Sequence, residues 1–590
     1  MVWYPNLYTV RVSLSKDGQV IDTDTQRFGI RKLEWNARSG LLINGSPVKL
    51  RGGCVHESNG PLGAMSFRET EYRRIRILKE SGYNAVRGAH DPRSKEFLNA
   101  CDEIGMYCME EFTDVWYQNV GTYGYSLYFM EEWEKDLTLM VEKCYNHPSV
   151  IMYSIGNEIS ESSSKKGAEL GGRMADLCRK LDDSRPVTMG VNLMLNAMDA
   201  NGIHIKIGKT AEVHKDDVVD PKSQDKGSAM SGSVAFNILF AVFKGLFVAT
   251  NSPKTQDRCT REIYSHLDIC GYNYGTNCYD LHMKNHPDRL IVATETRPGD
   301  TYKNWNYINK YPQMIGDFVW TSWDYLGECG IGIVDYGKNT GFYTKPYPVI
   351  IAGSGTHDIT GFRDTNAYMQ AIVWGVYQKP FIATRQPKYC KKRTHYGLYR
   401  QTDAINSWSY EGFEGQKTEA QIYSIGDSIE LFLNGRSNGK QKLKKCLARY
   451  KLTYEPGLLL AVSYDEAGRE IARDTLSSAG KETLITAVAE RKTIESGGDD
   501  LAYINVTLTD AQGITKPIEK LIRVKIEGDG SLLAVGSGAP RTEERYTGDC
   551  FTTYNGRMQV IVRSTENPGS IRITLSSEGL NDQTLEIQSK

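Results

Sequence analysis

The sequence predicts a multidomain protein of the α/β plus all-β class, in which a (β/α)8 TIM barrel is flanked by immunoglobulin-like β-sandwich domains. The chain has 590 residues, whereas a single hydrophobic core stops growing at roughly 250–300 residues. Short apolar runs alternate with helical segments from about residue 41 to 380, as in a barrel. After about residue 395 the pattern changes to the alternation of apolar and polar residues that is typical of strands.

Residues 1–31, at the start of the chain, are predicted to form β structure. Tyr8 to Leu14 alternates apolar and polar residues, which predicts a half-buried strand, and Lys16-Asp17-Gly18 is a hairpin turn signal. Two or three strands cannot form a stable domain alone. We therefore expect residues 1–31 to be the C-terminal strands of an immunoglobulin-like sandwich whose remainder is absent.

Residues 32–395 are predicted to form the catalytic barrel. The strand candidates are Val48–Cys54, Asn84–Arg87, Met106–Met109, Val150–Ile155, Val187–Gly190, Leu267–Tyr272, Leu290–Thr294 and Ile315–Trp320. Helix candidates between them include Arg68–Ser81, Ser94–Ile104, Glu131–Tyr145, Lys165–Leu181 and Thr301–Tyr311. A doubly wound open sheet would fit the same alternation. Polar residues follow strand after strand, however, and a barrel brings all eight carboxyl ends to one face.

One long insertion is expected after the fifth strand, over the polar residues 205–232. The apolar stretch Val234–Val248 is too short to span a bilayer and contains Lys244, so a buried or amphipathic helix is the better prediction.

Two further sandwiches are predicted at residues 403–490 and 491–590. In the first, Ser428–Leu433 precedes an Asn434-Gly435 turn, and in the second Ala502–Asp510 alternates cleanly.

The overall composition limits the partners, metal sites and cellular location that are expected. The 71 basic and 72 acidic residues give a net charge of −1, so neither nucleic acid nor an anionic membrane is expected as a partner. The 12 Cys include no CxxC pair and are expected to be mostly reduced and buried rather than metal-bound. The first residues lack the basic and apolar regions of a signal peptide, which predicts a cytoplasmic location. Homo-oligomerisation stays open.

Two glutamates carry the predicted chemistry. Retaining glycoside hydrolysis needs one protonated and one ionised carboxyl group about 5–5.5 Å apart. Glu158 and Glu295 each end an apolar barrel strand, one as Gly-Asn-Glu and the other as Ala-Thr-Glu. The alternative is that each glutamate only forms a salt bridge at a strand end. Their joint occurrence, with Asn157 beside Glu158, favours catalysis.

The sequence resembles glycoside hydrolase family 2, the β-galactosidase, β-glucuronidase and β-mannosidase group. The resemblance runs from about residue 4 into the C-terminal domains, and its motifs occur in the family's order and spacing. They are Phe28-Gly29-Ile30-Arg31, Asn44 to Gly52 with His56-Glu57, Asn84 to Arg87 with His90 and Pro92, Cys101 to Gly105, Asn146 to Glu158, and Thr294-Glu295.

The resemblance implies a role for each site residue. Glu295 is the nucleophile and Glu158 the acid/base. Asn157 matches the residue that binds the sugar 2-hydroxyl, and Arg87 one that orients the nucleophile. His56 and His90 match positions that line the sugar pocket, Tyr274 matches a tyrosine near the nucleophile, and Trp320 matches the floor beneath the sugar. Trp323 is assigned equally to the site and to the core.

The substrate is expected to be an oligosaccharide or glycoside, cleaved from its non-reducing end. We favour β-D-galactosides, since Trp323 to Glu328 looks like bacterial β-galactosidases, and keep β-glucuronides or β-galacturonides as the alternative. The uronide branch carries an Asn-x-Lys pair that Gly337 to Gly341 does not reproduce. Some members bind Mg²⁺ near the acid/base; Glu111 and Asp114 are the nearest candidates, but they form no firm ligand set and no cofactor is expected to be required. A non-catalytic carbohydrate-binding barrel is the alternative from another class.

Overall fold

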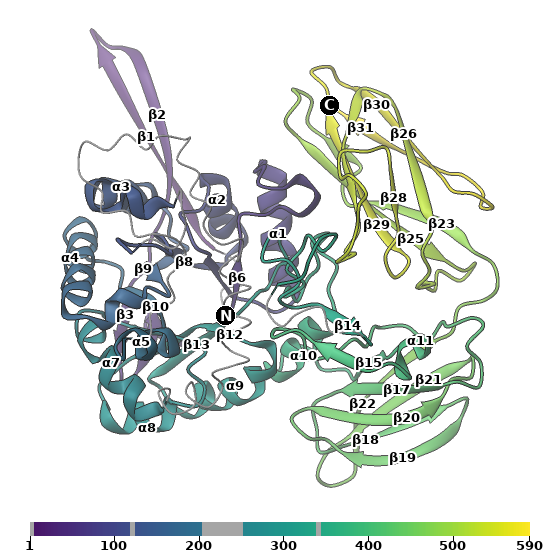
Figure 1. The fold of residues 1–590 in the computed structure, drawn as a ribbon. Helices are drawn as coiled ribbons and strands as arrows, with labels where there is room; N and C mark the ends of the chain where they lie inside the picture. The colour runs from purple at the N-terminus through teal and green to yellow at the C-terminus, as the bar shows by residue number, and fades with distance from the viewer. Residues whose placement is uncertain (1–4, 119–123, 203–251, 338–343) are drawn as a thin grey trace, which may run out of the picture. The chain divides into compact units, whose positions relative to one another are not determined.

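The structure is a computed structural model that describes residues 5–118, 124–202, 252–337 and 344–590 (Figure 1). The predictions made for residues 205–232, for Val234–Val248 and for most of the 337–341 segment lie outside the described residues.

Eight parallel strands close into a barrel, which confirms the predicted fold class. Each predicted strand corresponds to an observed one, shifted by at most a few residues at its ends. In order around the barrel the strands are β6 (Leu50–Val55), β7 (Ala85–Gly88), β8 (Tyr107–Glu111), β9 (Val150–Asn157), β10 (Val187–Asn192), β11 (Cys270–Asn273), β12 (Ile291–Thr296) and β13 (Met314–Val319).

The helices that follow these strands include the five that the sequence predicted. These are α1 (Arg68–Glu80), α2 (Lys95–Ile104), α3 (Phe129–Cys144), α4 (Lys165–Leu181) and α9 (Thr301–Lys310). Three more were not predicted, namely α5 (Leu193–Asp199), α7 (Pro253–Ser265) and α8 (Tyr279–Asn285). Helix α7 has a common N-terminal signal that the prediction missed. The Ser252 side chain accepts a hydrogen bond from Thr255 N–H, and Pro253 occupies the first helical position.

The hairpin at the start of the chain corrects one prediction. β1 (Leu7–Lys16) and β2 (Gln19–Gly29) form a two-stranded antiparallel sheet around the predicted turn, and Figure 1 shows it extending beyond the barrel helices. The strand is not half-buried, since Val12 and Leu14 are 63% and 60% exposed. Among the described residues no second layer covers this sheet, so both of its faces stay accessible.

A small three-stranded sheet follows the hairpin and leads into the barrel. It consists of β3 (Leu33–Asn36), β4 (Gly40–Ile43) and β5 (Ser46–Val48).

The residues after the barrel form mostly antiparallel sheets. A short pair, β14 (Val334–Tyr336) and β16 (Thr394–Tyr396), is accompanied by α10 (Thr365–Val373) and α11 (Pro387–Cys390). The next core lies between a sheet of β15 (Phe381–Thr384), β17 (Lys417–Tyr423) and β20 (Leu447–Thr453) and a sheet of β18 (Ser428–Leu433), β19 (Arg436–Lys442), β21 (Leu458–Tyr464) and β22 (Glu470–Ser477). As predicted, Asn434-Gly435 forms the turn between β18 and β19, with positive φ at both residues.

A last pair of sheets encloses its own apolar core. The first sheet contains β23 (Leu484–Ala489), β25 (Leu501–Thr509), β27 (Gly530–Gly536) and β29 (Arg557–Ser564). The second contains β24 (Thr493–Ile494), β26 (Leu521–Gly528), β28 (Cys550–Thr552), β30 (Gly569–Ser576) and β31 (Gln583–Ser589).

The chain divides into two compact units that are not continuous in sequence. Residues 1–56 and 83–320 form the first unit, and residues 57–82 and 321–590 form the second. Helix α1 therefore belongs to the second unit, although it follows the first barrel strand. All twelve cysteines are free thiols and eight of them are buried. None of the helices in the described ranges is long and apolar enough to cross a membrane.

Candidate active site

Glu295 lies near the carboxyl end of β12 and is only 4% exposed. Its Oε2 atom accepts hydrogen bonds from Arg87 Nη1 at 3.2 Å and from Asn273 Nδ2 at 3.2 Å, while its Oε1 atom accepts one from the Tyr274 hydroxyl. Two of these donors come from the end of the adjacent strand β11 and the third from β7, and together they fix the orientation of this carboxylate.

Glu158 follows β9 directly and has a left-handed backbone conformation, with φ of 53°. A non-glycine residue pays roughly 1–2 kcal/mol for this conformation. The backbone N–H of Glu158 donates to the Gly190 carbonyl at 2.7 Å, which holds the strained residue in place. Strain of this type is found mainly at functional sites, where the surrounding structure maintains it.

The carboxyl group of Glu158 is in a different environment from that of Glu295. Burial raises the pKa of Glu158 to about 7, and the nearby charge of Glu295 raises it as well. Asn192 and Asn273 donate to its Oε1 atom at 2.8 and 3.0 Å, and both bonds act in the opposite direction. Glu158 consequently keeps a proton at a pH where an ordinary glutamate has lost it.

The side-chain amide of Asn273 links the two glutamates. Its Nδ2 atom lies 3.0 Å from Glu158 Oε1 and 3.2 Å from Glu295 Oε2. The two oxygen atoms can therefore be no farther apart than these two lengths added together, which is less than ~6.5 Å. The same amide donates to Asn157 Oδ1 at 2.8 Å.

Behind these carboxylates lies a fully buried ion pair. Arg87, which is part of β7, donates to Glu111 at 2.7 to 3.0 Å and to Asn157 Oδ1 at 2.7 Å; both Arg87 and Glu111 are 0% exposed. Burial alone would raise the pKa of Glu111, but Arg87 and His90 hold it below its usual value. Arg87 therefore connects Glu295 to a second glutamate, Glu111.

An aromatic cluster forms one side of the site. The His90 ring stacks on the Trp320 ring at 4.9 Å with an interplanar angle of 3°, and His56 meets both rings edge-on at 6.1 and 6.2 Å. His90 Nδ1 is 2.8 Å from Glu111 Oε1. Burial alone would lower the pKa of His90, but the hydrogen bond and the charge of Glu111 raise it.

A cavity of about 470 Å³ opens beside the two histidines. Its other lining residues come from the segments after β7 and β8 and from α3 and the residues before it; they are Asp91, Pro92, Phe112, Thr113, Asp114, Tyr125 and Asp136. Three of these are aspartates, and none of the described lining residues is Lys or Arg.

The structure brings all eight predicted site residues into one cluster. Glu158, Glu295, Asn157, Arg87, His90 and Tyr274 belong to a single hydrogen-bond network, and His56 and Trp320 join it through the ring contacts of His90. Trp323, by contrast, is 4% exposed and stacks on His357 within the second unit.

Polar residues of the network that were not predicted as site residues include Asn273, Glu111 and Asn192. Each lies at the carboxyl end of a barrel strand, which was the signal available in the sequence.

Glu111, one of the two candidate Mg²⁺ ligands, is engaged by protein donors. Both oxygen atoms of Glu111 accept hydrogen bonds from protein donors, namely Arg87, His90 and Ser154. Over the described ranges there is no group of three or more His, Cys, Asp or Glu side chains arranged to hold a metal ion.

Comparison with known protein families matches four stretches of the chain. The TIM barrel domain of the glycosyl hydrolases family 2 matches residues 36–221, and the family's C-terminal domain 5 matches residues 485–586. A further family 2 domain matches residues 3–31, and a domain of unknown function (DUF4982) matches residues 415–472.

The chain is also similar to individual proteins of the family. It is 26% identical to a protein from Bacteroides ovatus named Beta-galactosidase BoGH2A, over 99% of this chain and 66% of that protein. It is 24% identical to a Beta-glucuronidase from Bacteroides fragilis, over 74% of this chain and 54% of that protein. The chain thus spans between about half and two thirds of the length of these relatives.

A crystal structure of a glycosyl hydrolase family 2 member from Bacteroides cellulosilyticus superposes with a TM-score of 0.83. The two sequences are 32% identical over 99% of this chain and 68% of that one. Together with the matching domains and the connected pair of glutamates at the barrel mouth, this likeness shows that the chain belongs to glycoside hydrolase family 2.

Proposed function

We propose that this chain is a retaining exo-β-glycosidase that acts on terminal β-D-galactosides. The observation that carries the proposal is the position of Asn273, whose single amide nitrogen is within hydrogen-bond distance of both Glu158 and Glu295. Retaining enzymes have their two carboxyl groups about 5–5.5 Å apart, whereas inverting enzymes separate them by about 6.5–9.5 Å to admit a water molecule. The short separation favours retention.

The environments of the two glutamates suit two different roles. In the first step Glu295 attacks the anomeric carbon, while Glu158 gives its proton to the glycosidic oxygen as the C–O bond to the aglycone breaks. In the second step Glu158 takes a proton from water, and the resulting hydroxide displaces Glu295 from the anomeric carbon. A pKa of about 7 for Glu158 suits a group that must both give and accept a proton near neutral pH.

Asn157 is oriented to assist this chemistry. Its Oδ1 atom already accepts hydrogen bonds from Arg87 and Asn273, so its amide nitrogen is turned toward the opposite side, where it lies 3.4 Å from His90 Nε2. This nitrogen can donate to the sugar 2-hydroxyl, a contact that strengthens in the oxocarbenium-like transition state.

The charge of the cavity beside His90 supports a neutral sugar. A uronic acid would bring a carboxylate toward Asp91, Asp114 and Asp136, and like charges at short range repel. The alternative, a β-glucuronidase or β-galacturonidase, is supported by the name of the relative from Bacteroides fragilis. A non-catalytic, carbohydrate-binding barrel is the least favoured candidate, because it has no need of two carboxylates connected through one amide group.

The test is hydrolysis of a panel of 4-nitrophenyl β-glycosides by the chain, with Glu295→Gln as the control. Release from the β-galactoside that disappears in the variant is the expected result, with the β-anomer of galactose as the first product seen by NMR. Preferential release from the β-glucuronide would replace the sugar and keep the mechanism. If the α-anomer formed first, the retaining mechanism would be wrong. Activity that persists in Glu295→Gln would remove Glu295 from its role as nucleophile.

A further inference from the structure

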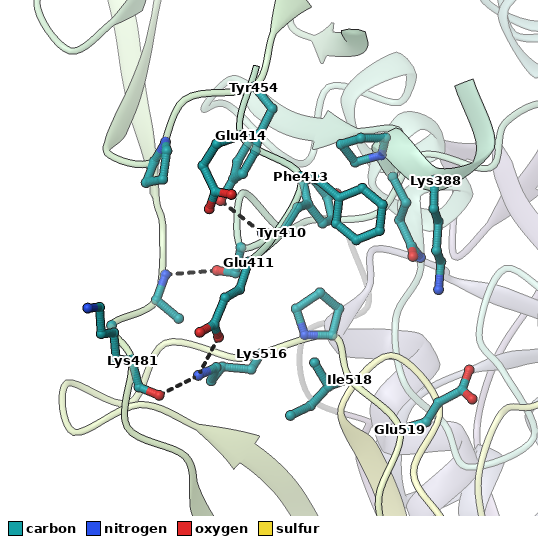
Figure 2. A pocket seen from close by; sticks show the side chains of 17 residues that line it. Lys388, Tyr410, Glu411, Phe413, Glu414, Tyr454, Lys481, Lys516, Ile518 and Glu519 are labelled. Carbon is teal, nitrogen blue, oxygen red and sulfur yellow. Dashed lines mark hydrogen bonds and ion pairs between the residues drawn. The ribbon is translucent and has the colours of Figure 1, made fainter. Parts of the chain in front are cut away.

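A second cleft lies within the second unit, and its lining residues are far in sequence from those of the candidate active site. It has a volume of about 470 Å³, which is in the range of small-molecule sites. Figure 2 shows the side chains that line it. They come from the start of α11, the residues before β17, the loop after β20, the connection between β22 and β23, and the loop before β26. No role follows for this cleft from the glycosidase chemistry.

The floor of the cleft is held together by a buried lysine. Lys516 is 4% exposed, and its Nζ atom donates to the Lys481 and Glu482 carbonyls at 2.9 and 3.3 Å. The same atom lies 3.3 Å from a carboxylate oxygen of Glu411, whose side chain is 69% exposed. Figure 2 shows the contacts of Lys516 with Glu411 and Lys481. Gly480 N–H donates to Asp510 at 2.7 Å on the same connection. These contacts fix the positions of the residues that line the cleft.

Apolar surfaces line the cleft next to this polar floor. Phe413 and Ile518 are half-buried, so part of each remains accessible, and three prolines contribute further flat, apolar surface. Tyr410 and Tyr454 are buried and their hydroxyls bond to the protein, so these two residues support the wall of the cleft. Aromatic rings stack well on the apolar C–H faces of pyranoses, whose hydroxyls remain free at the ring edge.

The charges in the cleft are balanced. Three lysines, Lys388, Lys481 and Lys516, face three glutamates, Glu411, Glu414 and Glu519. A strongly anionic ligand, such as a polyuronate or a nucleotide, would meet as many repulsive as attractive groups. A neutral ligand with many hydroxyls suits both signs, because a carboxylate accepts from one hydroxyl while a neighbouring ammonium donates to the next. Lys516 already donates to three protein oxygens and so holds Glu411 in place, which leaves the exposed Glu411 carboxylate to accept from a ligand hydroxyl.

We propose that this cleft binds a neutral oligosaccharide, as a carbohydrate-binding site separate from the barrel. One sugar ring packs on Phe413 and places a hydroxyl against the carboxylate of Glu411. Such a site would keep the protein on a polymeric glycan while the barrel acts on a chain end. The inference does not depend on which sugar the barrel cleaves.

The experiment measures binding by titration calorimetry with the full chain, in the Glu295→Gln background so that no substrate is consumed. The probes are three neutral tetrasaccharides (β-1,4-linked galactose, glucose and mannose) and tetragalacturonate as the charged comparator. We expect two binding events for at least one neutral tetrasaccharide and only weaker or no binding of tetragalacturonate. Replacing Phe413 by Ala should weaken one of the two events at least about tenfold, the factor that corresponds to 1.4 kcal/mol.

Two further variants guard against a misfolded protein. Glu411→Gln keeps a side-chain oxygen that can accept from Lys516 and is expected to weaken the same event. Glu466→Gln, at an exposed glutamate of the same domain outside the cleft, should change nothing. In chains that retain Glu295, all three variants should hydrolyse nitrophenyl glycosides at the parent rate, so this assay reports on the barrel alone. The proposal is overturned if neutral tetrasaccharides bind at one site only, if the cleft variants leave both events intact, or if only tetragalacturonate binds to the cleft.

Discussion

Glu158 differs from an ordinary glutamate in its proton affinity, and this difference has a measurable consequence. Its raised pKa of about 7 means that the acid form is lost as the pH rises above 7. We therefore expect kcat/KM for a nitrophenyl β-galactoside to fall about tenfold per pH unit on the alkaline side of this value. The measurement is a pH–rate profile from pH 5 to 9. A rate that stays constant to pH 9 would contradict the assignment of Glu158 as the acid.

Asn192 and Asn273 touch the same oxygen atom of Glu158 and so form a matched pair for mutation. Of the two glutamates, Asn192 contacts Glu158 and not Glu295. Its Oδ1 atom also caps α5. Asn192→Ser keeps a capping oxygen, removes a donor that lowers the pKa of Glu158, and should shift the alkaline limb to higher pH with a modest loss of rate.

Asn273→Ser removes a donor to both glutamates and should lower kcat by about 10²-fold or more. The pH profiles of the two variants with one substrate provide the comparison. Equal losses in both would indicate that the bridge between the carboxyl groups has no special importance.

The residue scale also marks the limit of the sequence-based prediction. Glu158 and Glu295 were predicted because each ends an apolar strand, a one-dimensional pattern. The bridging role of Asn273 depends on three strands, of which β9 lies more than a hundred residues before β11 and β12, and a lone asparagine after a strand does not reveal its partners. Glu111 was considered only as a metal ligand, since its pairing with Arg87 depends on the adjacent position of β7 and β8.

At the scale of elements, β10 supports the site without contributing a reactive group. A Cβ atom at Gly190 would lie 2.8 Å from Asn157 Oδ1 and 2.9 Å from Arg87 Nη2, closer than real contacts allow. The Gly190 carbonyl also accepts the backbone N–H of Glu158. The strand therefore needs glycine at this position so that the network can pack against its backbone.

Gly190→Ala should accordingly reduce kcat/KM at least about 10²-fold, because a displacement of about 1 Å in a catalytic constellation has this effect. The circular dichroism spectrum should stay unchanged. Kinetics on the nitrophenyl galactoside together with thermal unfolding provide the check. Full activity in this variant would show that the network can move away from β10 at no cost.

The elements were predicted to different accuracy for a physical reason. Barrel strands are buried on both faces, so they read as continuous apolar runs with polar ends, and all eight were found. The alternation in β1 is equally clear, but periodicity reports only which side chains share a face. It cannot report whether another layer covers that face, and the predicted half-burial of Val12 and Leu14 was wrong.

At the scale of the whole molecule, α1 is tied to the last sandwich by an ion pair within the second unit. Arg73 is 4% exposed, binds Glu490 through two bonds of 2.8 Å and stacks on Tyr503 at 4.4 Å. Burial alone would raise the pKa of Glu490, but Arg73 holds it below its usual value. The pair thus stabilises the fold at pH values above about 4.3, the pKa of a glutamate in the unfolded chain. This stabilisation is lost as the pH falls through the pKa of Glu490 in the folded protein, which is lower.

Arg73→Ala should therefore destabilise the second unit by about 2 kcal/mol at pH 7. Breaking a fully buried ion pair costs ~3–5 kcal/mol, and the smaller value is expected here because Glu490 is partly exposed. The matched control is Arg76→Ala, whose pair with Glu69 is 40% exposed on the arginine side and should be worth less than about 1 kcal/mol. Urea unfolding of both variants at pH 7 and pH 3 gives the comparison. Equal losses at both pH values would contradict an electrostatic origin.

The division of the chain into two units has a consequence for how such genes can recombine. Residues 57–82 lie between the first two barrel strands in sequence, yet they belong to the unit that also contains residues 321–590. A crossover at the codon for residue 321 would join a foreign C-terminal half to an α1 helix selected for different neighbours, including the partner of Arg73. Lineages that exchange these C-terminal domains are therefore expected to carry matching changes in a 26-residue stretch encoded hundreds of base pairs upstream.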